Sequence, residues 1–296
     1  MEEISLNKIT TDSLSLPISR EKTRQADVLR LDKIHPFVSG NKWFKLRYYL
    51  EEAKATGKKT IVTYGGAWSN HILATAAACK INGLHSIGII RGEATTAMSP
   101  TLQQAKELGM QLIYMSREDY RQRKIPEELQ QSGYYFIAEG GYGPAGADGA
   151  ATILDHCRKE NYTHICCAAG TGTMTAGLVK GALSTQTIIA VSVLKNNLDL
   201  EKDIQRLAAN GPALFQLIHD YHFGGYAKYQ PALIAFMNEF YHDTGVPSDF
   251  VYTGKLFFAI NELARNNFFP EGSKIIIIHS GGLPGNASLS KGTLIF

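Results

Sequence analysis

The sequence lacks long hydrophobic runs, has few cysteines and carries no strong excess of either charge. None of its apolar stretches approaches the roughly 20 residues that a membrane-spanning helix needs, and its acidic, polar start is unlike a secretory signal peptide. Its 30 Lys and Arg residues and 27 Asp and Glu residues are interspersed, which disfavours nucleic acid as a partner. We therefore expect a cytoplasmic protein that binds neither membrane nor nucleic acid.

Cysteine and histidine usage excludes further classes of chemistry. Of the four cysteines, Cys166 and Cys167 are adjacent in an apolar segment, and Cys79 and Cys157 stand in no CxxC spacing. We expect buried, reduced thiols rather than disulfides or a redox motif. The nine histidines never adopt a ligand spacing with cysteine or acidic residues, so we expect no metal site.

The chain from about residue 40 onward has the pattern of an α/β protein. Short apolar runs bounded by glycine alternate with longer segments of helical period, which predicts mostly parallel sheets. The expected strands are 60–64, 86–90, 111–114, 134–137, 164–168, 187–193 and 274–278, and the expected helices include 44–55 and 100–108. The Gly-rich stretch 139–149 is where we expect a domain boundary or hinge. If two α/β lobes meet there, the crevice between them would be the ligand site.

A lysine stands at the expected start of the first helix. Its block reads Ser39-Gly40-Asn41-Lys42-Trp43-Phe44-Lys45-Leu46, and Asn41 would be the N-cap. The positive end of a helix dipole disfavours an ammonium group. A lysine that must be neutral to attack an aldehyde gains from this field, because the field lowers its pKa. Lys42 is therefore either a nucleophile or an ordinary lysine of a first helical turn.

The end of the expected strand 60–64 leads into a turn suited to a carboxylate. The turn reads Gly65-Gly66-Ala67-Trp68-Ser69-Asn70-His71 and precedes a helix rich in small residues. Helix N–H groups and the Ser69 hydroxyl could hold a carboxylate, Asn70 could bind a phenolic oxygen and His71 would add a donor. The alternative is that Ser69 and Asn70 only cap the helix.

A second strand end leads into a turn suited to a phosphate. It reads Gly170-Thr171-Gly172-Thr173-Met174-Thr175-Ala176-Gly177, where glycines, threonine hydroxyls and a helix N-terminus would meet an anion. Thr175 stands where a dinucleotide fingerprint needs glycine, and the Lys-Ser/Thr pair of a Walker A motif is missing. A single phosphate ester therefore fits better than a nucleotide.

Three further positions lie toward the carboxyl end of the chain. Tyr226 follows a pair of glycines, and Tyr252 lies in Val251-Tyr252-Thr253-Gly254-Lys255. The last strong strand runs into His279-Ser280-Gly281-Gly282, where Ser280 could present its hydroxyl to a ring nitrogen.

With these blocks in order, the sequence resembles the fold-type-II (tryptophan synthase beta-like) pyridoxal-phosphate enzymes, in the family of 1-aminocyclopropane-1-carboxylate deaminases and D-cysteine desulfhydrases. The family's G-G-N-K-x-R-K-L block corresponds to residues 39–46, its S-N-Q/H block to 69–71 and its phosphate turn to 170–177. Its two active-site tyrosines have the spacing of Tyr226 and Tyr252. Its V-Y-[ET]-G-K and H-[LT]-G-G segments correspond to 251–255 and 279–282.

The resemblance implies a fold, a cofactor and a role for each site residue. It implies two open, mostly parallel-sheet α/β domains, a large one of residues 1–44 and 146–296 and a smaller one of 45–145, with the cofactor between them and the chain in a homodimer. The residues expected to bind pyridoxal 5'-phosphate are Lys42, as a Schiff base, Lys45, Asn70, Gly170, Thr171, Gly172, Thr173, Met174, Thr175 and Ser280. Ser69, Asn70 and His71 would bind the carboxylate of a small amino acid, and the expected catalytic residues are Lys42, Ser69, Tyr226 and Tyr252.

One departure from the family bears on the substrate. The deaminase branch has glutamate directly after the second tyrosine, where this sequence has Thr253. Because a neutral partner supports a weaker electron sink, we expect β-elimination, with D-cysteine desulfhydrase activity giving pyruvate, ammonia and sulfide. The alternatives are a 1-aminocyclopropane-1-carboxylate deaminase giving 2-oxobutanoate and ammonia, and a non-catalytic protein that binds pyridoxal phosphate or a nucleotide.

Overall fold

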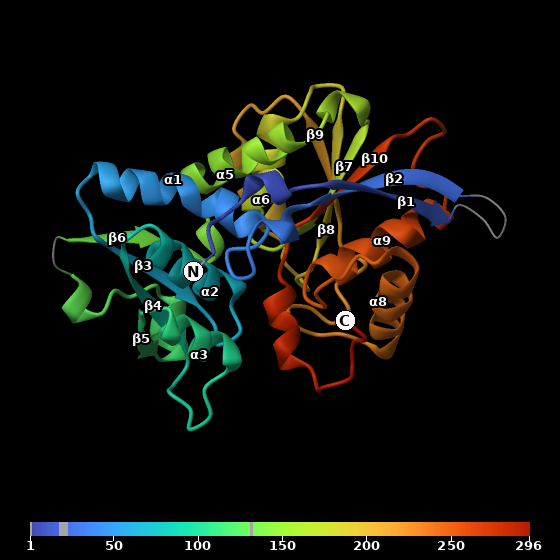
Figure 1. Cartoon of the computed structure of the whole chain (residues 1–296). Coiled ribbons are helices and arrows are strands. Elements are labelled where there is room, and N and C mark those ends of the chain that lie inside the picture. The colour runs from blue at the N-terminus through green and yellow to red at the C-terminus, as the bar shows by residue number, and fades with distance from the viewer. Residues whose placement is uncertain (1, 18–22, 131–132) are drawn as a thin grey trace.

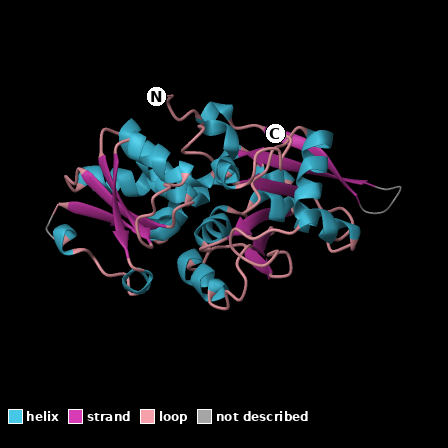
Figure 2. Cartoon of the chain, turned by 90° about the horizontal axis from the view of Figure 1, so that it is seen from below, coloured by secondary structure: helices cyan, strands magenta, loops and turns pink. Residues whose placement is uncertain are grey.

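The computed structural model describes residues 2–17, 23–130 and 133–296, which build two separate sheets with helices packed around each (Figures 1 and 2). The larger sheet has the strand order β1-β2-β10-β7-β8-β9, and the smaller has β5-β4-β3-β6. Within the described pairs, β1 and β2 run antiparallel and the others run parallel. The predicted α/β fold with mostly parallel sheets is confirmed.

Every strand expected from the sequence is present, and three more complete the larger sheet. The larger sheet holds β1 (Thr11–Pro17), β2 (Thr23–Arg30), β7 (His164–Ala169), β8 (Thr187–Ser192), β9 (Leu214–Ile218) and β10 (Ile275–His279). The smaller holds β3 (Thr60–Gly65), β4 (His85–Arg91), β5 (Met110–Met115) and β6 (Tyr134–Ile137). The helices are α1 (Asn41–Ala55), α2 (Asn70–Ile81), α3 (Pro100–Glu107), α4 (Arg117–Arg121), α5 (Pro144–Ala151), α6 (Thr173–Gly181), α7 (Leu200–Ala208), α8 (Pro231–Thr244) and α9 (Thr253–Arg265).

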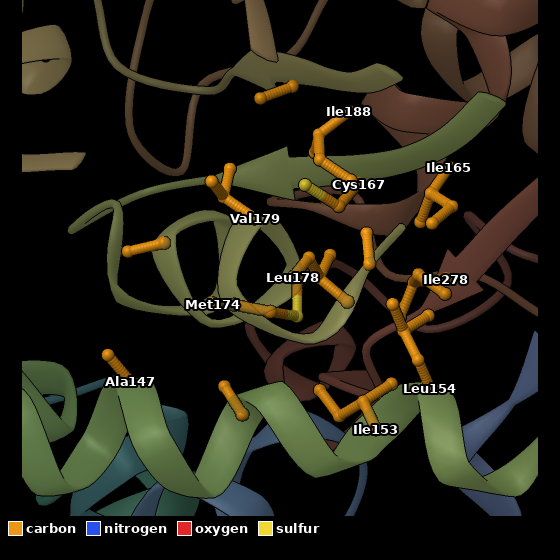
Figure 3. Close-up of a cluster of buried hydrophobic side chains, with 14 of the residues drawn as sticks. Ala147, Ile153, Leu154, Ile165, Cys167, Met174, Leu178, Val179, Ile188 and Ile278 are labelled. Atoms are coloured by element: carbon orange, nitrogen blue, oxygen red, sulfur yellow. The ribbon is translucent and has the colours of Figure 1, made fainter. Parts of the chain in front are cut away.

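The larger sheet is covered on both faces, which explains why its central strands are apolar throughout. Along β10, Ile276 and Ile278 belong to a cluster with α5, α6 and α7, while Ile275 and Ile277 pack with α9. Successive side chains of a strand point to opposite faces, so each face receives every second isoleucine. Figure 3 shows Leu178 of α6 lying between the sheet and the segment that carries Ile153.

We propose that residues 1–44 and 146–296 form one domain and residues 45–145 the other. The strands of the smaller sheet all lie between Thr60 and Ile137, which supports this division. The proposed boundary at residue 45 falls inside α1, so this continuous helix would join the two domains. Among the described residues, no helix is both long and apolar enough to cross a bilayer.

Candidate active site

A cavity of about 450 Å³ lies where the carboxyl ends of strands from both sheets meet the start of α1. Open parallel sheets bind ligands at this end of their strands. The predicted site residues that line the cavity are Lys42, Lys45, Ser69, Asn70, His71, Gly170, Thr171, Gly172, Met174, Thr175, Tyr226, Tyr252 and Ser280. Thr173 does not line it, and its hydroxyl lies 3.0 Å from that of Thr171. The cavity thus brings together residues from both ends of the chain.

The start of α1 is fixed against the turn that follows β10. Gly40 is the N-cap and Asn41 the first helical residue, so the expectation that Asn41 caps the helix is wrong. Gly40 has a φ of 62°, and a Cβ at this position would lie 1.9 Å from the carbonyl oxygen of Ser280. Only glycine fits such an approach. The N–H of Asn41 donates to the same carbonyl at 3.2 Å, which fixes Lys42 beside Ser280.

Lys42 has the environment of a nucleophilic amine. Burial lowers the pKa of Lys42 to about 8, although the negative charge of Asp249 opposes this shift. Its Nζ donates to Asn41 Oδ1 at 3.2 Å and lies 5.7 Å from the centre of the Tyr252 ring. A substantial fraction of the amine is therefore neutral near physiological pH and able to attack an aldehyde.

Lys45 lies one turn further along α1 and meets the same cavity. It is 4% exposed, and its Nζ donates to the carbonyl oxygen of Gly140 at 2.9 Å. Burial, and then the charge of Lys42, hold the pKa of Lys45 well below its usual value. Two buried amines at one corner favour an anionic ligand, because an anion would relieve the repulsion between their charged forms.

The phosphate turn lies between β7 and α6. Gly172 is the N-cap of α6, so the helix begins at Thr173. The first N–H groups of a helix lack acceptors within it, and the partial positive charge at this end attracts an anion. Together with Lys45, the turn therefore offers both backbone donors and a cation to a phosphate group.

The polar wall formed by the start of α2 has acceptors without partners. Ser69 caps α2 by accepting from the N–H of Ile72. Asn70 Oδ1 and His71 Nδ1 are buried and have no hydrogen-bond partner among the described residues. Buried acceptors without donors are costly, so this wall fits a ligand that brings donors such as a phenolic hydroxyl.

The side chain of His71 offers an acceptor rather than the additional donor expected from the sequence. The Thr63 hydroxyl donates to the carbonyl oxygen of Ile137 and lies 2.8 Å from His71 Nε2, so we assign the proton of this contact to Nε2. Burial, and then the charges of Lys42 and Lys45, hold the pKa of His71 well below its usual value. The ring is therefore neutral, and Nδ1 carries a lone pair.

Tyr226 and Tyr252 both line the cavity and contact one another. Their rings meet edge to face, with centroids 6.3 Å apart. Burial, and then the neighbouring Tyr226 and Asp249, raise the pKa of Tyr252 well above its usual value, and burial also raises the pKa of Tyr226. Both phenols therefore keep their protons at neutral pH and act as hydrogen-bond donors.

A buried carboxylate holds Tyr252 in place, and the sequence analysis missed it. Asp249 is fully buried and accepts hydrogen bonds from the N–H groups of Val251, Tyr252 and Thr253 at 3.0, 2.9 and 2.9 Å. An aspartate just before an expected helix is a capping signal, and this pattern could have identified it. Asp249 thus fixes the start of α9, and its negative charge opposes the lowering of the pKa of Lys42.

A second buried acid, also missed, lies behind the Ser280 turn. His279 precedes Ser280 and is fully buried, with Nδ1 3.3 Å from Asp32 Oδ1 and Nε2 2.6 Å from the carbonyl oxygen of Pro247. Asp32 in turn pairs with Arg30 at 2.7 Å. No local motif indicates that Asp32 and Pro247 contact His279, because the three residues come from segments that are far apart in the sequence.

Comparison with known proteins places this geometry in a family. Residues 5–281 match the family described as pyridoxal-phosphate dependent enzymes. A Pyrococcus horikoshii protein with the provisional name 1-aminocyclopropane-1-carboxylate deaminase is 31% identical, with 90% of this chain and 87% of that protein covered. The D-cysteine desulfhydrase of Serratia proteamaculans is 26% identical, with 86% of each covered. The crystal structure of a homologue of 1-aminocyclopropane-1-carboxylate deaminase matches with a TM-score of 0.81 at 28% identity, covering 96% of this chain and 92% of that one.

Fold and site together fit an enzyme that binds a phosphorylated aldehyde beside a buried lysine. The cavity has a lysine of lowered pKa, a phosphate turn and buried hydrogen-bond acceptors without a partner among the described residues. The chain belongs to the pyridoxal-phosphate-dependent enzyme family. Its cofactor is pyridoxal phosphate, and the non-catalytic alternative no longer applies.

Proposed function

We propose that this enzyme eliminates the thiol group of D-cysteine, so that D-cysteine and water give pyruvate, ammonia and hydrogen sulfide. The observation that supports this choice is the environment of Thr253. Its hydroxyl donates to Asp249 Oδ1 at 2.7 Å and accepts from the N–H of Asp249 at 2.7 Å, and it does not line the cavity. The residue after Tyr252 therefore offers no carboxylate to a cofactor ring, and the neutral Ser280 is the proposed partner of the ring nitrogen.

A neutral partner suits the loss of a good leaving group. Bound pyridoxal phosphate supplies an aldehyde that links to amines and a ring that accepts negative charge from the α-carbon. Opening of a cyclopropane ring requires a stronger electron sink in the cofactor ring than departure of a thiolate from the β-carbon does. The weaker electron sink expected beside Ser280 therefore favours elimination.

The binding roles follow from the arrangement of donors around the cavity. Lys45 and residues 170–175 would hold the phosphate through one ammonium group and the first N–H groups of α6. Ser69 and the N–H groups at the start of α2 would hold the substrate carboxylate. Asn70 would contact the ring hydroxyl of the cofactor. These contacts would orient the α-carbon of the substrate between Lys42 and the two tyrosines.

The pKa shifts favour Lys42 over Tyr252 as the acceptor of the substrate's α-proton. The pKa of Lys42 is lowered to about 8 by burial, whereas burial raises that of Tyr252 well above its usual value. The Nζ amine of Lys42 is therefore the proposed acceptor of the α-proton of the substrate. Tyr252 would keep its proton and donate a hydrogen bond to the departing sulfur.

The second candidate function is 1-aminocyclopropane-1-carboxylate deamination. It is supported by the relative of that name, whose 31% identity exceeds the 26% of the D-cysteine desulfhydrase. The same residues would bind this substrate, and the product would be 2-oxobutanoate. Because 1-aminocyclopropane-1-carboxylate has no sulfur, the phenols of Tyr226 and Tyr252 would have no leaving group to bind.

A product assay separates the two functions. Purified protein loaded with cofactor would be given D-cysteine, L-cysteine, D-serine and 1-aminocyclopropane-1-carboxylate in parallel, with pyruvate and 2-oxobutanoate quantified separately. We expect pyruvate from D-cysteine at a rate well above that from the other three. Release of 2-oxobutanoate as the dominant product would instead establish the deaminase and show that the neutral ring partner does not decide the substrate.

Cofactor capture should depend on pH through Lys42. Because its pKa is lowered to about 8 and the neutral amine attacks, the rate should rise about tenfold per pH unit below pH 8 and level off above it. Stopped-flow measurement of the visible absorption band, after mixing cofactor-free protein with pyridoxal phosphate, follows this rate. A rate that keeps rising toward the ordinary lysine value of 10.5 would contradict the lowered pKa.

We also propose that the enzyme is a cytoplasmic homodimer. The proposal is supported by the family resemblance. Light scattering coupled to size-exclusion chromatography would give the mass of the assembly directly.

A further inference from the structure

The loop that carries Tyr226 to the cavity has an unfavourable backbone. It joins β9 to α8 and contains no helix or strand between Ile218 and Pro231. Phe223 and Ala227 have φ values of 51° and 52°, and Gly224 and Gly225 have 94° and 113°. Residues with a Cβ rarely adopt this left-handed region, and they remain there only where neighbouring structure enforces it.

A buried lysine provides that enforcement. Lys255 lies in α9 and is fully buried. Its Nζ donates to the carbonyl oxygens of His222 and Gly225 at 2.9 and 2.7 Å, so one contact lies directly before the left-handed segment and the other within it. Burial lowers the pKa of Lys255 to about 8, and the negative charge of Asp249 opposes that shift. A buried ammonium group is costly unless it is compensated, and here two carbonyl oxygens accept its hydrogen bonds while the negative charge of Asp249 favours its charged form.

Lys255 joins the loop to the helix that begins directly after Tyr252. Tyr226 lines the cavity but is 41% exposed, so the packing around its side chain is incomplete. Its contact with the Tyr252 ring therefore depends on the position of the loop. The Phe223 ring packs on Phe258 of α9, with centroids 4.9 Å apart, which is an apolar contact on the same side of the loop.

We infer that Lys255 is a positioning residue that holds residues 222–227 against α9 and so sets Tyr226 opposite Tyr252 over the cavity. The inference rests on the proposed role of Tyr226 in the reaction. Lys255 itself touches neither substrate nor cofactor, because it does not line the cavity. It acts on turnover only through the loop.

The first experiment compares two lysines with the same substitution. Lys255→Met removes the donor from the buried site, and Lys228→Met removes an exposed lysine of the same loop. With D-cysteine, we expect Lys255→Met to lower kcat about tenfold to a hundredfold with a smaller change in KM, because misplacing a reacting group acts mainly on the transition state. Lys228→Met should leave both parameters unchanged, and all variants should keep the visible absorption band.

Loop release has a readout that needs no substrate. Chymotrypsin cleaves after aromatic residues, and the loop holds Tyr221, Phe223, Tyr226 and Tyr229. We expect the loaded Lys255→Met protein to be cut in this loop faster than the wild type or Lys228→Met. If the methionine variant does not fold, Lys255→Gln takes its place. Cleavage at the wild-type rate in a folded variant would overturn the inference whatever the substrate is.

A double-mutant cycle separates failure of the inference from failure of the proposed function. If Lys255 acts through Tyr226, adding Lys255→Met to Tyr226→Phe should lower kcat little further. Two losses that multiply would overturn the inference while leaving the role of Tyr226 intact. An unchanged kcat in Tyr226→Phe alone would remove the proposed role of Tyr226, and the inference with it. Lys255→Arg, which keeps the charge and the donors, should recover part of the lost kcat.

Discussion

Replacing Lys42 with alanine is expected to abolish the visible absorption of bound cofactor and to lower turnover by at least about a thousandfold. Lys42 Nζ combines a pKa lowered to about 8 with a position over the Tyr252 ring. Alanine removes both the amine that links to the aldehyde and the proposed proton acceptor. An absorption spectrum and a pyruvate assay with D-cysteine measure the two effects on one sample.

Lys45 provides the matched control for this experiment. It lies on the same helix, lines the same cavity and has a pKa held below its usual value by burial and by Lys42. Lys45→Met should weaken cofactor binding yet retain the visible band at saturating pyridoxal phosphate, because its proposed contact is with the phosphate. A Lys42→Ala protein that keeps the band would show that another amine carries the cofactor.

The second large effect is expected from Asp249→Ala, which should lower the free energy of unfolding by about 3–5 kcal/mol. The carboxylate accepts from three backbone N–H groups and from the Thr253 hydroxyl in a fully buried place. Alanine leaves these donors unpaired. Urea unfolding followed by circular dichroism measures the change in stability.

Thr253→Val serves as the control, since it removes the two hydrogen bonds of the Thr253 hydroxyl and keeps the buried charge. We expect a loss of about 1–3 kcal/mol, as for two hydrogen bonds. Asp249→Ala should also move the pH at which cofactor capture levels off to a lower value, because its charge raises the pKa of Lys42. Equal losses of stability in the two variants would mean that the carboxylate contributes no more than the Thr253 hydroxyl does.

The residues around the cavity were predictable where a local pattern encodes them. Glycines at strand ends, polar residues at helix starts and Lys42 in a first turn are visible in the sequence, and the structure gathers them around one cavity. Asp32, behind His279, and Lys255, behind Tyr226, are different. Their importance comes from tertiary contacts between distant segments, so no local spacing marks Asp32, and the segment 251–255 contains Lys255 without indicating its role.

Two of the three strands that escaped prediction, β1 and β9, have little buried apolar surface. In β1 only alternate residues, Leu14 and Leu16, are buried, and β9 has Leu214 73% exposed. A strand at the edge of a sheet, open to solvent on one side, has no continuous apolar run. The burial of β7, β8 and β10 on both faces produced the runs that the sequence showed plainly.

The position of β10 has a consequence for how the enzyme is made. This strand is the last in the chain, yet it lies in the middle of the larger sheet, between β2 and β7. During synthesis, the hairpin of β1 and β2 leaves the ribosome long before the strand that joins it to the others. The contact between Asn41 and Ser280 forms only then. Lys42 therefore reaches its final position only after β10 has been synthesised, and a nascent chain that lacks β10 has an incomplete cofactor site.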